Sequence, residues 1–331
     1  MKKSSIFTVA LIICLILLGT VAFTVFGVSV GGYANAEKYQ AGDTEISAAV
    51  ENLEINWTEG TVNIVFHEGS GVSVSETAKK PLSDDLRLRW WLDGTTLRIQ
   101  YAKSGLRISA DSLEKALTVS LPEGLVLGTA AIHGTSADFN IAALAAEDMI
   151  LETTSGNITA LVAAKKLKAG STSGDMDIRQ RGGSDSVTFD STSGSILASV
   201  EDARVISASS TSGSVTLTQL GGADSVKLHS TSGSIKAEAL SAEKVTIDST
   251  SGSAAVQLHT VRELKIDSTS GSVTVTLPTA PGFTCKVSTA SGSFNSDIAL
   301  SKSGDTYACG DGSGSIDIHT TSGNIRLLEE K

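Results

Sequence analysis

The chain has 331 residues and a formal net charge of −10, with 40% hydrophobic and 19% charged residues. This acidic balance argues against nucleic acid, or any anionic surface, as the main partner. The apolar content and the presence of only 4 prolines oppose wholesale disorder, and the length suffices for a membrane anchor, a small β module and a long repeat.

A long uncharged segment opens the sequence. Lys2 and Lys3 precede a run without charges over residues 4–36, and the core of this run at residues 6–30 is long enough to cross a bilayer. The positive-inside rule keeps the two lysines in the cytoplasm and sends the rest of the chain outward.

The same segment also carries a small-residue motif, Ala34-Asn35-Ala36, of the form that signal peptidase cleaves. The apolar run is longer than the usual signal core of about 7–15 residues, which favours an uncleaved anchor. We expect residues 1–36 to form a single-pass transmembrane signal anchor in the cell membrane, with residues 37–331 outside the cytoplasm. A cleaved signal peptide is the alternative.

Residues 37–130 read as short strands joined by turns. The expected strands are residues 53–57, 62–66, 72–76, 86–91, 97–101 and 116–121. Asp93-Gly94 between two of these runs fits a hairpin turn. Trp57, Trp90 and Trp91 all lie here, where aromatic strand residues more often fill a core or cover an open end than form a ligand platform. We expect residues 37–130 to form a β-rich N-terminal region that caps the start of the repeat.

A Ser-Gly corner recurs along residues 131–331. Its glycines are Gly156, Gly174, Gly194, Gly213, Gly233, Gly252, Gly271 and Gly292, at intervals of 18, 20, 19, 20, 19, 19 and 21 residues. A degenerate copy at residues 135–139 precedes them, and a last copy lies at residues 320–324. So regular a period is typical of one structural unit stacked many times.

Apolar residues occupy the same positions in almost every repeat. Counted from the corner glycine they fall at −7, −5, +2 and +4, as Val226, Leu228, Ile235 and Ala237 do around Gly233. Alternation with period two is typical of a half-buried strand, and stacking at roughly 4.8 Å buries the apolar face of each strand pair. The sequence predicts an all-β fold, a parallel β-solenoid with about 19–20 residues per coil.

Two features of the repeat are expected from the same pattern. Glycine suits a corner that needs either a positive φ or a space without a side chain. The charges of Glu329-Glu330-Lys331 are expected at the far end of the rod, where the last edge strand would otherwise be bare.

The histidines, His67, His133, His229, His259 and His319, are scattered over separate expected strands without catalytic or zinc-ligand spacing. No nucleophile elbow, phosphate loop or Cys-x-x-Cys occurs, and the many serines are explained as repeat corners. We therefore expect no catalytic, cofactor-binding or metal-binding residue, no cofactor, and no enzyme activity.

One outward column, at position −4, is nevertheless rich in polar groups. It contains Glu152, Asp190, His229, Asp248, Asp267 and His319. Asp248 and Asp267 belong to adjacent repeats, so they could share a calcium ion, but too few oxygen ligands are specified and a solvated acidic stripe is the preferred interpretation. A pectate-lyase-like enzyme would need a basic cluster beside these carboxylates. An ice-binding face along the threonines at −2 would need uncharged neighbours.

Two cysteines, Cys285 and Cys309, lie in the expected exported part of the chain. An oxidising exterior permits a disulfide between them. Cys285 falls in the inward −7 column, so a buried free thiol is an equal alternative.

The N-terminal anchor, the strand-rich lead-in, Leu121-Pro122 before the first repeat and the Ser-Gly-Ser or Ser-Gly-Asn corners resemble one known family. This is the bacterial putative-adhesin family of β-strand repeat proteins, which includes LiaG-like envelope proteins. The resemblance covers most of residues 50–327. It implies a β-repeat fold and supplies no catalytic residues, while the frequent Ser-Gly-Asp corner of the family is mostly replaced here by Ser-Gly-Ser.

These observations favour a non-enzymatic, membrane-anchored cell-surface protein. Its rigid solenoid would present a binding face to a cell-wall polymer, a glycan or a surface protein, and its N-terminal helix would hold it in the membrane. A purely structural role in the envelope or in its stress response is the close alternative, and a polysaccharide-acting β-helix enzyme is the third.

Overall fold

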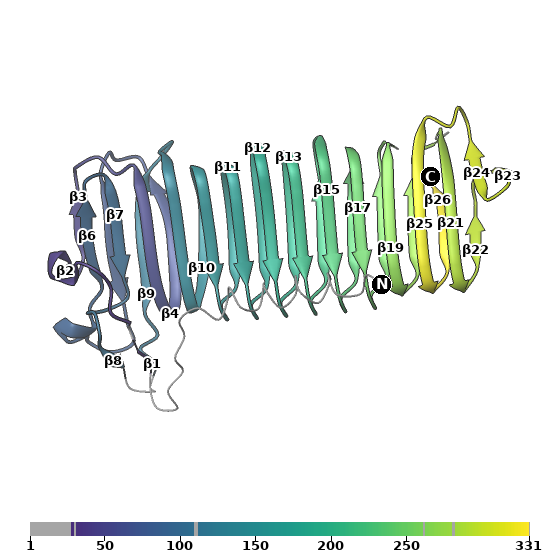
Figure 1. Ribbon diagram of the computed structural model, residues 1–331. Helices are drawn as coiled ribbons and strands as arrows, with labels where there is room; N and C mark the ends of the chain where they lie inside the picture. The colour runs from purple at the N-terminus through teal and green to yellow at the C-terminus, as the bar shows by residue number, and fades with distance from the viewer. Residues whose placement is uncertain (1–27, 30, 109–111, 261, 280–281, 331) are drawn as a thin grey trace.

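The computed structural model describes residues 28–29, 31–108, 112–260, 262–279 and 282–330. Their strands stack side by side into a long rod (Figure 1). The strands of the repeat are β10 (Val126–Thr153), β11 (Ile158–Ser171), β12 (Met176–Ser191), β13 (Ile196–Ser210), β14 (Val215–Gln219), β15 (Ala223–Ser230), β16 (Ile235–Leu240), β17 (Ala242–Ser249), β18 (Ala254–Leu258), β19 (Glu263–Ser270) and β20 (Val273–Leu277).

Each coil has a leading strand before its corner glycine and a trailing strand after it. In the coil around Gly233 these are β15 and β16, and they pair in parallel with β17 and β18 of the next coil. Leading strands thus stack on leading strands and trailing strands on trailing strands. This arrangement confirms the parallel stacking that the period predicts.

The expected core columns are buried in the inner coils, and Val287 and Phe294 of the outermost coil are partly buried. Val226, Leu228, Ile235 and Ala237 are each at most 1% exposed, and the same four positions are buried in neighbouring coils. The apolar side chains of successive coils form one continuous cluster along the rod. The stack is therefore held by apolar burial between the two walls and by the parallel backbone ladders.

Close packing, not backbone conformation, requires the corner glycines. No corner glycine of residues 156–323 has a positive φ. A β-carbon on Gly233 would lie only 2.0 Å from the carbonyl oxygen of Gly213 in the coil below, and Gly252 meets Gly233 in the same way. Glycine is therefore needed at the corner because there is no space for a side chain, and not because the backbone has a positive φ.

A column of hydroxyl groups lies inside the corner, three residues before each glycine. Ser210, Ser230 and Ser249 are buried there. The Ser210 hydroxyl accepts a hydrogen bond from the Gly213 N–H (2.9 Å), and the Ser249 hydroxyl donates to the Gly252 carbonyl (2.7 Å). These bonds satisfy backbone groups that the tight corner removes from the ladder.

At the N-terminal end the coils do not follow the order of the sequence. The strand β4 (Asn52–His67) pairs in parallel with β10 on one side and with β7 (Thr96–Gln100) and β9 (Ala116–Pro122) on the other. The coil nearest this end of the rod is thus built from residues 96–122, and residues 52–67 form the second. The parallel ladders therefore extend well into the region expected as a cap.

Antiparallel strands close this end. β5 (Val72–Thr77) pairs with β9, and β6 (Arg89–Asp93) forms the expected Asp93-Gly94 hairpin with β7. The short strands β2 (Gln40–Ala41) and β3 (Thr44–Ile46) pair with β6 and β5. β5 and β6 thus cover the edges of β9 and β7, which would otherwise be open to another chain.

The aromatic residues of this region fill or cover the end of the core, as expected. Trp57 is 1% exposed and packs edge-to-face on Tyr101, with 5.0 Å between ring centroids. Trp90 and Trp91 are partly exposed on β6, where Trp91 contacts Tyr39.

One expected strand of the cap starts later than the sequence indicates. The prediction placed a strand at residues 86–91, but Asp84–Leu86 is the 3-10 helix η2 and the strand begins at Arg89. The Leu86 N–H donates a hydrogen bond to the Ser83 carbonyl, and the buried Lys115 ammonium donates one to the Leu86 carbonyl. Both backbone groups of Leu86 are therefore used outside a strand ladder. A second 3-10 helix, η1, spans Ala36–Lys38.

The C-terminal end also departs from chain order. The coil formed by β25 (Gly314–Ser322) and β26 (Ile325–Glu329) lies between the coil of β19 and β20 and the coil of β21 (Phe283–Ser291) and β22 (Phe294–Ser296). The hairpin of β23 (Ser301–Ser303) and β24 (Thr306–Cys309) covers β21 in antiparallel fashion. The expectation that residues 329–331 protect the last edge is therefore wrong, because β26 has a neighbour on both sides.

Most of the expected transmembrane segment, residues 1–27, lies outside the described residues. At its end, β1 (Val28–Ser29) is extended and pairs with β8 (Arg107–Ile108), where the sequence placed the last part of the helix. Among the described residues no helix has the length and apolarity to span a bilayer.

The corner packing gives a direct test. Gly233→Ala should destabilise the protein by about 3 kcal/mol or more, because its β-carbon has no space against the Gly213 carbonyl. Ser234→Ala, at the neighbouring exposed position, should change the unfolding free energy by less than about 0.5 kcal/mol. Urea unfolding measures both, and equal effects of the two substitutions would contradict this account of the corner.

Candidate functional site

The column at position −4 contains the acidic and histidine residues that the sequence singled out. Its register runs from His229 to Asp248, then Asp267, then His319, in four consecutive coils. Asp248 and Asp267 are direct neighbours, as expected. His319 is the neighbour of Asp267 only because the coil of β25 and β26 is inserted there, a contact that chain order does not predict.

The interactions in this column are with neighbouring side chains. Lys265 Nζ lies 2.6 Å from Asp267 Oδ2. Glu152 lies 3.5 Å from His133 Nδ1 and accepts a hydrogen bond from Lys168 (2.6 Å), and these two neighbours lower its pKa to about 2. Burial raises the pKa of Asp190, and the charge of Lys168 opposes this effect. Within the described part of the chain, no group of three or more His, Cys, Asp or Glu side chains is placed to hold a metal ion.

A second charged column lies at the opposite corner, nine residues before each glycine. Along the rod it reads Glu147, Lys165, Asp185, Arg204, Asp224, Glu243 and Arg262. Arg204 lies between Asp185 (4.0 Å) and Asp224 (3.1 Å), and Arg262 lies 3.9 Å from Glu243. The pattern of residues near the corner glycine does not include this column. The column can be recognised in the sequence, because a charged residue stands nine positions before each corner glycine from Gly156 to Gly271 and the sign of its charge mostly alternates.

This column borders a groove of about 440 Å³ that follows the rod over several coils. We call it the charged corner groove. Its lining residues are Ser184, Asp202, Ala203, Arg204, Gly222, Ala223, Asp224, Ser241, Ala242, Glu243, Thr260 and Arg262. Ser184, Ala203 and Ala242 are buried and form the floor, whereas the Arg204 and Arg262 side chains are 66% and 62% exposed at the rim.

The rim charges are suited to binding more than to stability. Ion pairs between solvent-exposed side chains contribute about 0–1 kcal/mol, so a ligand can replace one partner at little cost to the fold. A floor of small side chains lets an extended chain lie close to the backbone. The groove therefore offers polar contacts that repeat from coil to coil in the direction of the rod.

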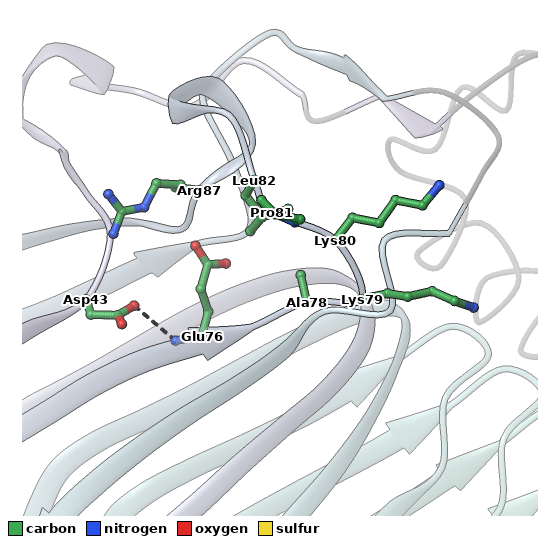
Figure 2. A pocket seen from close by; sticks show the side chains of 8 residues that line it. All are labelled: Asp43, Glu76, Ala78, Lys79, Lys80, Pro81, Leu82 and Arg87. Atoms are coloured by element: carbon green, nitrogen blue, oxygen red, sulfur yellow. Dashed lines mark hydrogen bonds between the residues drawn. The ribbon is translucent and has the colours of Figure 1, made fainter.

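A second hollow, of about 380 Å³, lies in the cap (Figure 2). Asp43 accepts the Glu76 N–H (3.1 Å), while the Lys79 and Lys80 side chains extend away from the hollow. The Glu76 carboxylate is already engaged by the Leu88 N–H (2.7 Å) and by Lys115 (2.6 Å). Its charged groups do not converge, so we rank it below the groove as a binding site.

Behind this hollow lies a fully buried ammonium group. Lys115 Nζ pairs with Glu76 and donates to the carbonyls of Leu86 (2.8 Å) and Tyr101 (2.6 Å), so that its three donors have partners. The rings of Trp57 and Tyr101 lie 4.9 and 4.3 Å from it. Burial lowers the pKa of Lys115, and the Glu76 charge opposes this effect. The cluster closes the core at the N-terminal end, where Lys115 takes the place of a corner residue.

The cysteines are not bonded to each other. Cys309 lies opposite Phe283 and Cys285 opposite Tyr307, so the two thiols are diagonal neighbours across β21 and β24. Diagonal β-carbons in a sheet are about 7–8 Å apart, whereas a disulfide needs about 3.5–4.5 Å. Burial raises the pKa of Cys285 to about 12, as expected for the buried free thiol that the sequence left open.

The Toastrack DUF4097 family model matches residues 50–181, 122–220 and 164–328 in overlapping segments, as a stack of repeats allows. The chain belongs to this family. No curated protein matches this Toastrack chain in sequence.

Solved structures resemble the Toastrack chain at low identity. A putative adhesin from Parabacteroides distasonis is 16% identical, with 88% of this chain and 97% of that chain covered and a TM-score of 0.40. A putative cell adhesion protein from Clostridium sporogenes is 12% identical, with 88% and 100% covered and a TM-score of 0.25. A putative lipid binding protein from Parabacteroides distasonis is 14% identical, with 91% and 99% covered and a TM-score of 0.40. Likeness at this level adds no evidence on function.

The buried ion pair makes the cap of this Toastrack chain testable. Lys115→Met should destabilise the protein by about 3–5 kcal/mol, because it leaves the Glu76 carboxylate buried without its cation. Adding Glu76→Gln should recover most of that loss, since the remaining group is neutral. Tryptophan fluorescence during urea unfolding reports on the cap, and a double variant less stable than Lys115→Met would show that the charge is not the cause.

The acidic column predicts no dependence on calcium. Chelator should leave the melting temperature of residues 37–331 unchanged, because Asp267 is already paired with Lys265 and the stack is held by apolar burial. A calcium-dependent rise in melting temperature that disappears in Asp248→Asn would contradict this, since a structural ion stabilises in proportion to the logarithm of its concentration over its dissociation constant.

Proposed function

We propose that this chain is a non-enzymatic, membrane-anchored cell-surface binding protein, which holds an extended polar ligand along the charged corner groove. The observation that carries the proposal is the groove itself. It combines a floor of small buried residues with exposed charges of both signs at a constant spacing along the rod.

The ligand that fits such a groove is linear and polar. Arg204 and Arg262 can bind carboxylates or phosphates, and Asp202, Asp224 and Glu243 can accept hydrogen bonds from hydroxyl or ammonium groups. A cell-wall polymer, a glycan or an extended segment of a surface protein has this character. Nucleic acid does not fit, because its uniform negative charge would meet the acidic groups of the rim.

The polar groups of the described residues support binding rather than catalysis. In the −4 column Glu152 lies beside His133 and Lys168 and Asp267 pairs with Lys265, and the residues that line the groove include arginines and carboxylates without histidine or cysteine. A polysaccharide-cleaving enzyme would need a cluster of basic residues beside Asp248 and Asp267. In the described residues, the ion pair of Asp267 is with a single lysine, Lys265.

The packing of the chain where it enters the rod supports an orientation. Tyr33, near the end of the expected anchor, donates a hydrogen bond to the Ala102 carbonyl (3.1 Å) at the cap. We therefore place the cap end toward the membrane, with the repeat projecting outward and the groove held away from the bilayer.

Binding to material from the same cells tests the proposal. Residues 37–331 should retain wall polymer, glycan or surface protein, and Arg204→Glu together with Arg262→Glu should reduce retention at least tenfold by changing both basic groups of the groove. Lys227→Glu, an exposed position on the leading wall outside the groove, is the control for charge alone. Ala223→Tyr, at a partly exposed position that lines the groove, should obstruct the groove without any change of charge.

Three outcomes would change the conclusion. Failure to retain any of the three materials favours the purely structural role in the envelope. Retention that the groove substitutions leave unchanged places the ligand elsewhere on the rod. Turnover of an acidic polysaccharide that Asp248→Ala or Asp267→Ala abolishes establishes the enzyme instead.

A further inference from the structure

The chain enters the cap directly after its long apolar segment. Residues 6–27 carry no charge and exceed the roughly 20 residues that a membrane span needs. The residues that follow already belong to the cap, where β1 pairs with β8 (Figure 1). Tyr33 is fixed there as well, because its N–H donates to the Ser104 hydroxyl (3.1 Å) and its own hydroxyl donates to the Ala102 carbonyl (3.1 Å). The six residues 28–33 span at most about 20 Å, so the cap cannot stand far from the end of the apolar segment.

A row of aromatic rings starts at this entry point. Tyr33 packs edge-on against Tyr39, with 4.8 Å between ring centroids, and Tyr39 packs in the same way on Trp91, at 5.6 Å. Side chains alternate between the two faces of β6, so Trp90 packs against the buried core cluster while Trp91 lies on the other face with Tyr39. We call Tyr33, Tyr39 and Trp91 the entry aromatics, and all three are partly exposed.

Long cationic side chains lie over the last ring of this row. Lys38 Nζ is 4.7 Å from the centroid of the Trp91 ring, and the guanidinium carbon of Arg98 is 6.0 Å from it. Arg98 is also paired with Glu54 and Asp93, so this surface is not a basic patch. Lys38 is exposed, and its ammonium can reach toward phosphate groups while its aliphatic stem stays on the ring.

Partly exposed Tyr and Trp rings beside such cations are characteristic of the layer between the hydrocarbon core of a bilayer and water. Each ring has an apolar body and a polar group, and the headgroup layer, about 5–7 Å thick on each side, accommodates both. The entry aromatics follow one another by direct ring contacts from the point where the chain reaches the cap. A bilayer that holds the apolar segment therefore lies close to all three rings.

We infer that the entry aromatics and Lys38 lie in the headgroup layer, so that the cap rests on the membrane surface. The partner is zwitterionic lipid, because the charge of Arg98 is balanced by Glu54 and Asp93 and the contact does not depend on anionic headgroups. This inference rests on the membrane anchoring proposed above and is independent of any ligand in the charged corner groove. A second attachment beside the anchor limits how far the rod can tilt.

Lipid-attached quenchers test the contact with the full chain in phosphatidylcholine vesicles. Phosphatidylcholine that carries a spin label near its headgroup should quench the tryptophan emission of the wild-type chain. Trp91→Phe should reduce this quenching several-fold while it keeps an aromatic ring in the row. Trp57 and Trp90 are present in both chains, so the difference reports on Trp91. Urea unfolding of the variant checks that the cap is folded.

A tryptophan far from the cap is the matched control. Leu197→Trp, added to Trp91→Phe, places a ring at a 49% exposed position of β13. Dissolved acrylamide should quench this ring, and the lipid-attached label should not. Equal lipid quenching at position 197 would mean that the whole rod lies on the bilayer, and it would overturn a contact made by the cap.

Flotation with the vesicles separates the remaining outcomes. If the chain floats with the vesicles but acrylamide alone quenches Trp91, the ring faces water or another partner, and the inference is overturned while the anchor stands. A chain that does not float with the vesicles overturns the anchor and the inference together. Neither result bears on the groove, which is tested through retention by residues 37–331.

Discussion

The rod depends on the contact between the corner glycine of one coil and the backbone carbonyl of the coil below. At a spacing of about 4.8 Å there is no space for a β-carbon at that point, so the contact fixes both the position of the corner and the register of the two walls. Because a register shift of one residue would turn every inward side chain outward, a precise corner is what keeps the apolar columns continuous. The buried serines three residues earlier complete the corner by bonding its free backbone groups.

A stack of this kind has two open ends, and the chain closes both by the same means. At each end the outermost parallel coil is not the first or last in sequence. Antiparallel strands cover it: β5 and β6 cover both of its strands at the cap, and β24 covers its leading strand β21 at the other end. Inserting a coil between segments distant in sequence links the stability of each end to contacts over a long stretch of chain. The ends are thereby less prone to fray than the terminal units of a strictly sequential stack.

The sequence period predicts the features that every coil shares, and it does not predict the order in which the coils stack. The alternation around Gly233 was sufficient to assign inward residues such as Leu228 and Ile235, because each coil buries them in the same way. The order of the coils could not be read in this manner, since Ile316 and Ile318 fit the columns of any coil. What places them beside residues 263–270 is the pairing of strands far apart in sequence, together with charges such as Asp317 between two lysines. The groove was missed for a related reason: Arg204 and Asp224 each look like ordinary surface residues until successive repeats are aligned on their glycines.

The division between inward and outward positions also separates stability from function. Inward positions are restricted to a few residue types by packing, whereas outward positions pair with their neighbours through weak, solvent-exposed contacts. Sequence differences between coils therefore gather outside, and a surface that departs from the repeat, such as the charged rim of the groove, is where selection for binding can act without disturbing the stack. The Ser and Thr edge at the corner is more regular, and its buried hydroxyl groups three residues before the glycines bond the backbone of the tight turn. Regularity along this rod thus reports on folding, and the charged corner, where charge changes from coil to coil, is the better guide to recognition.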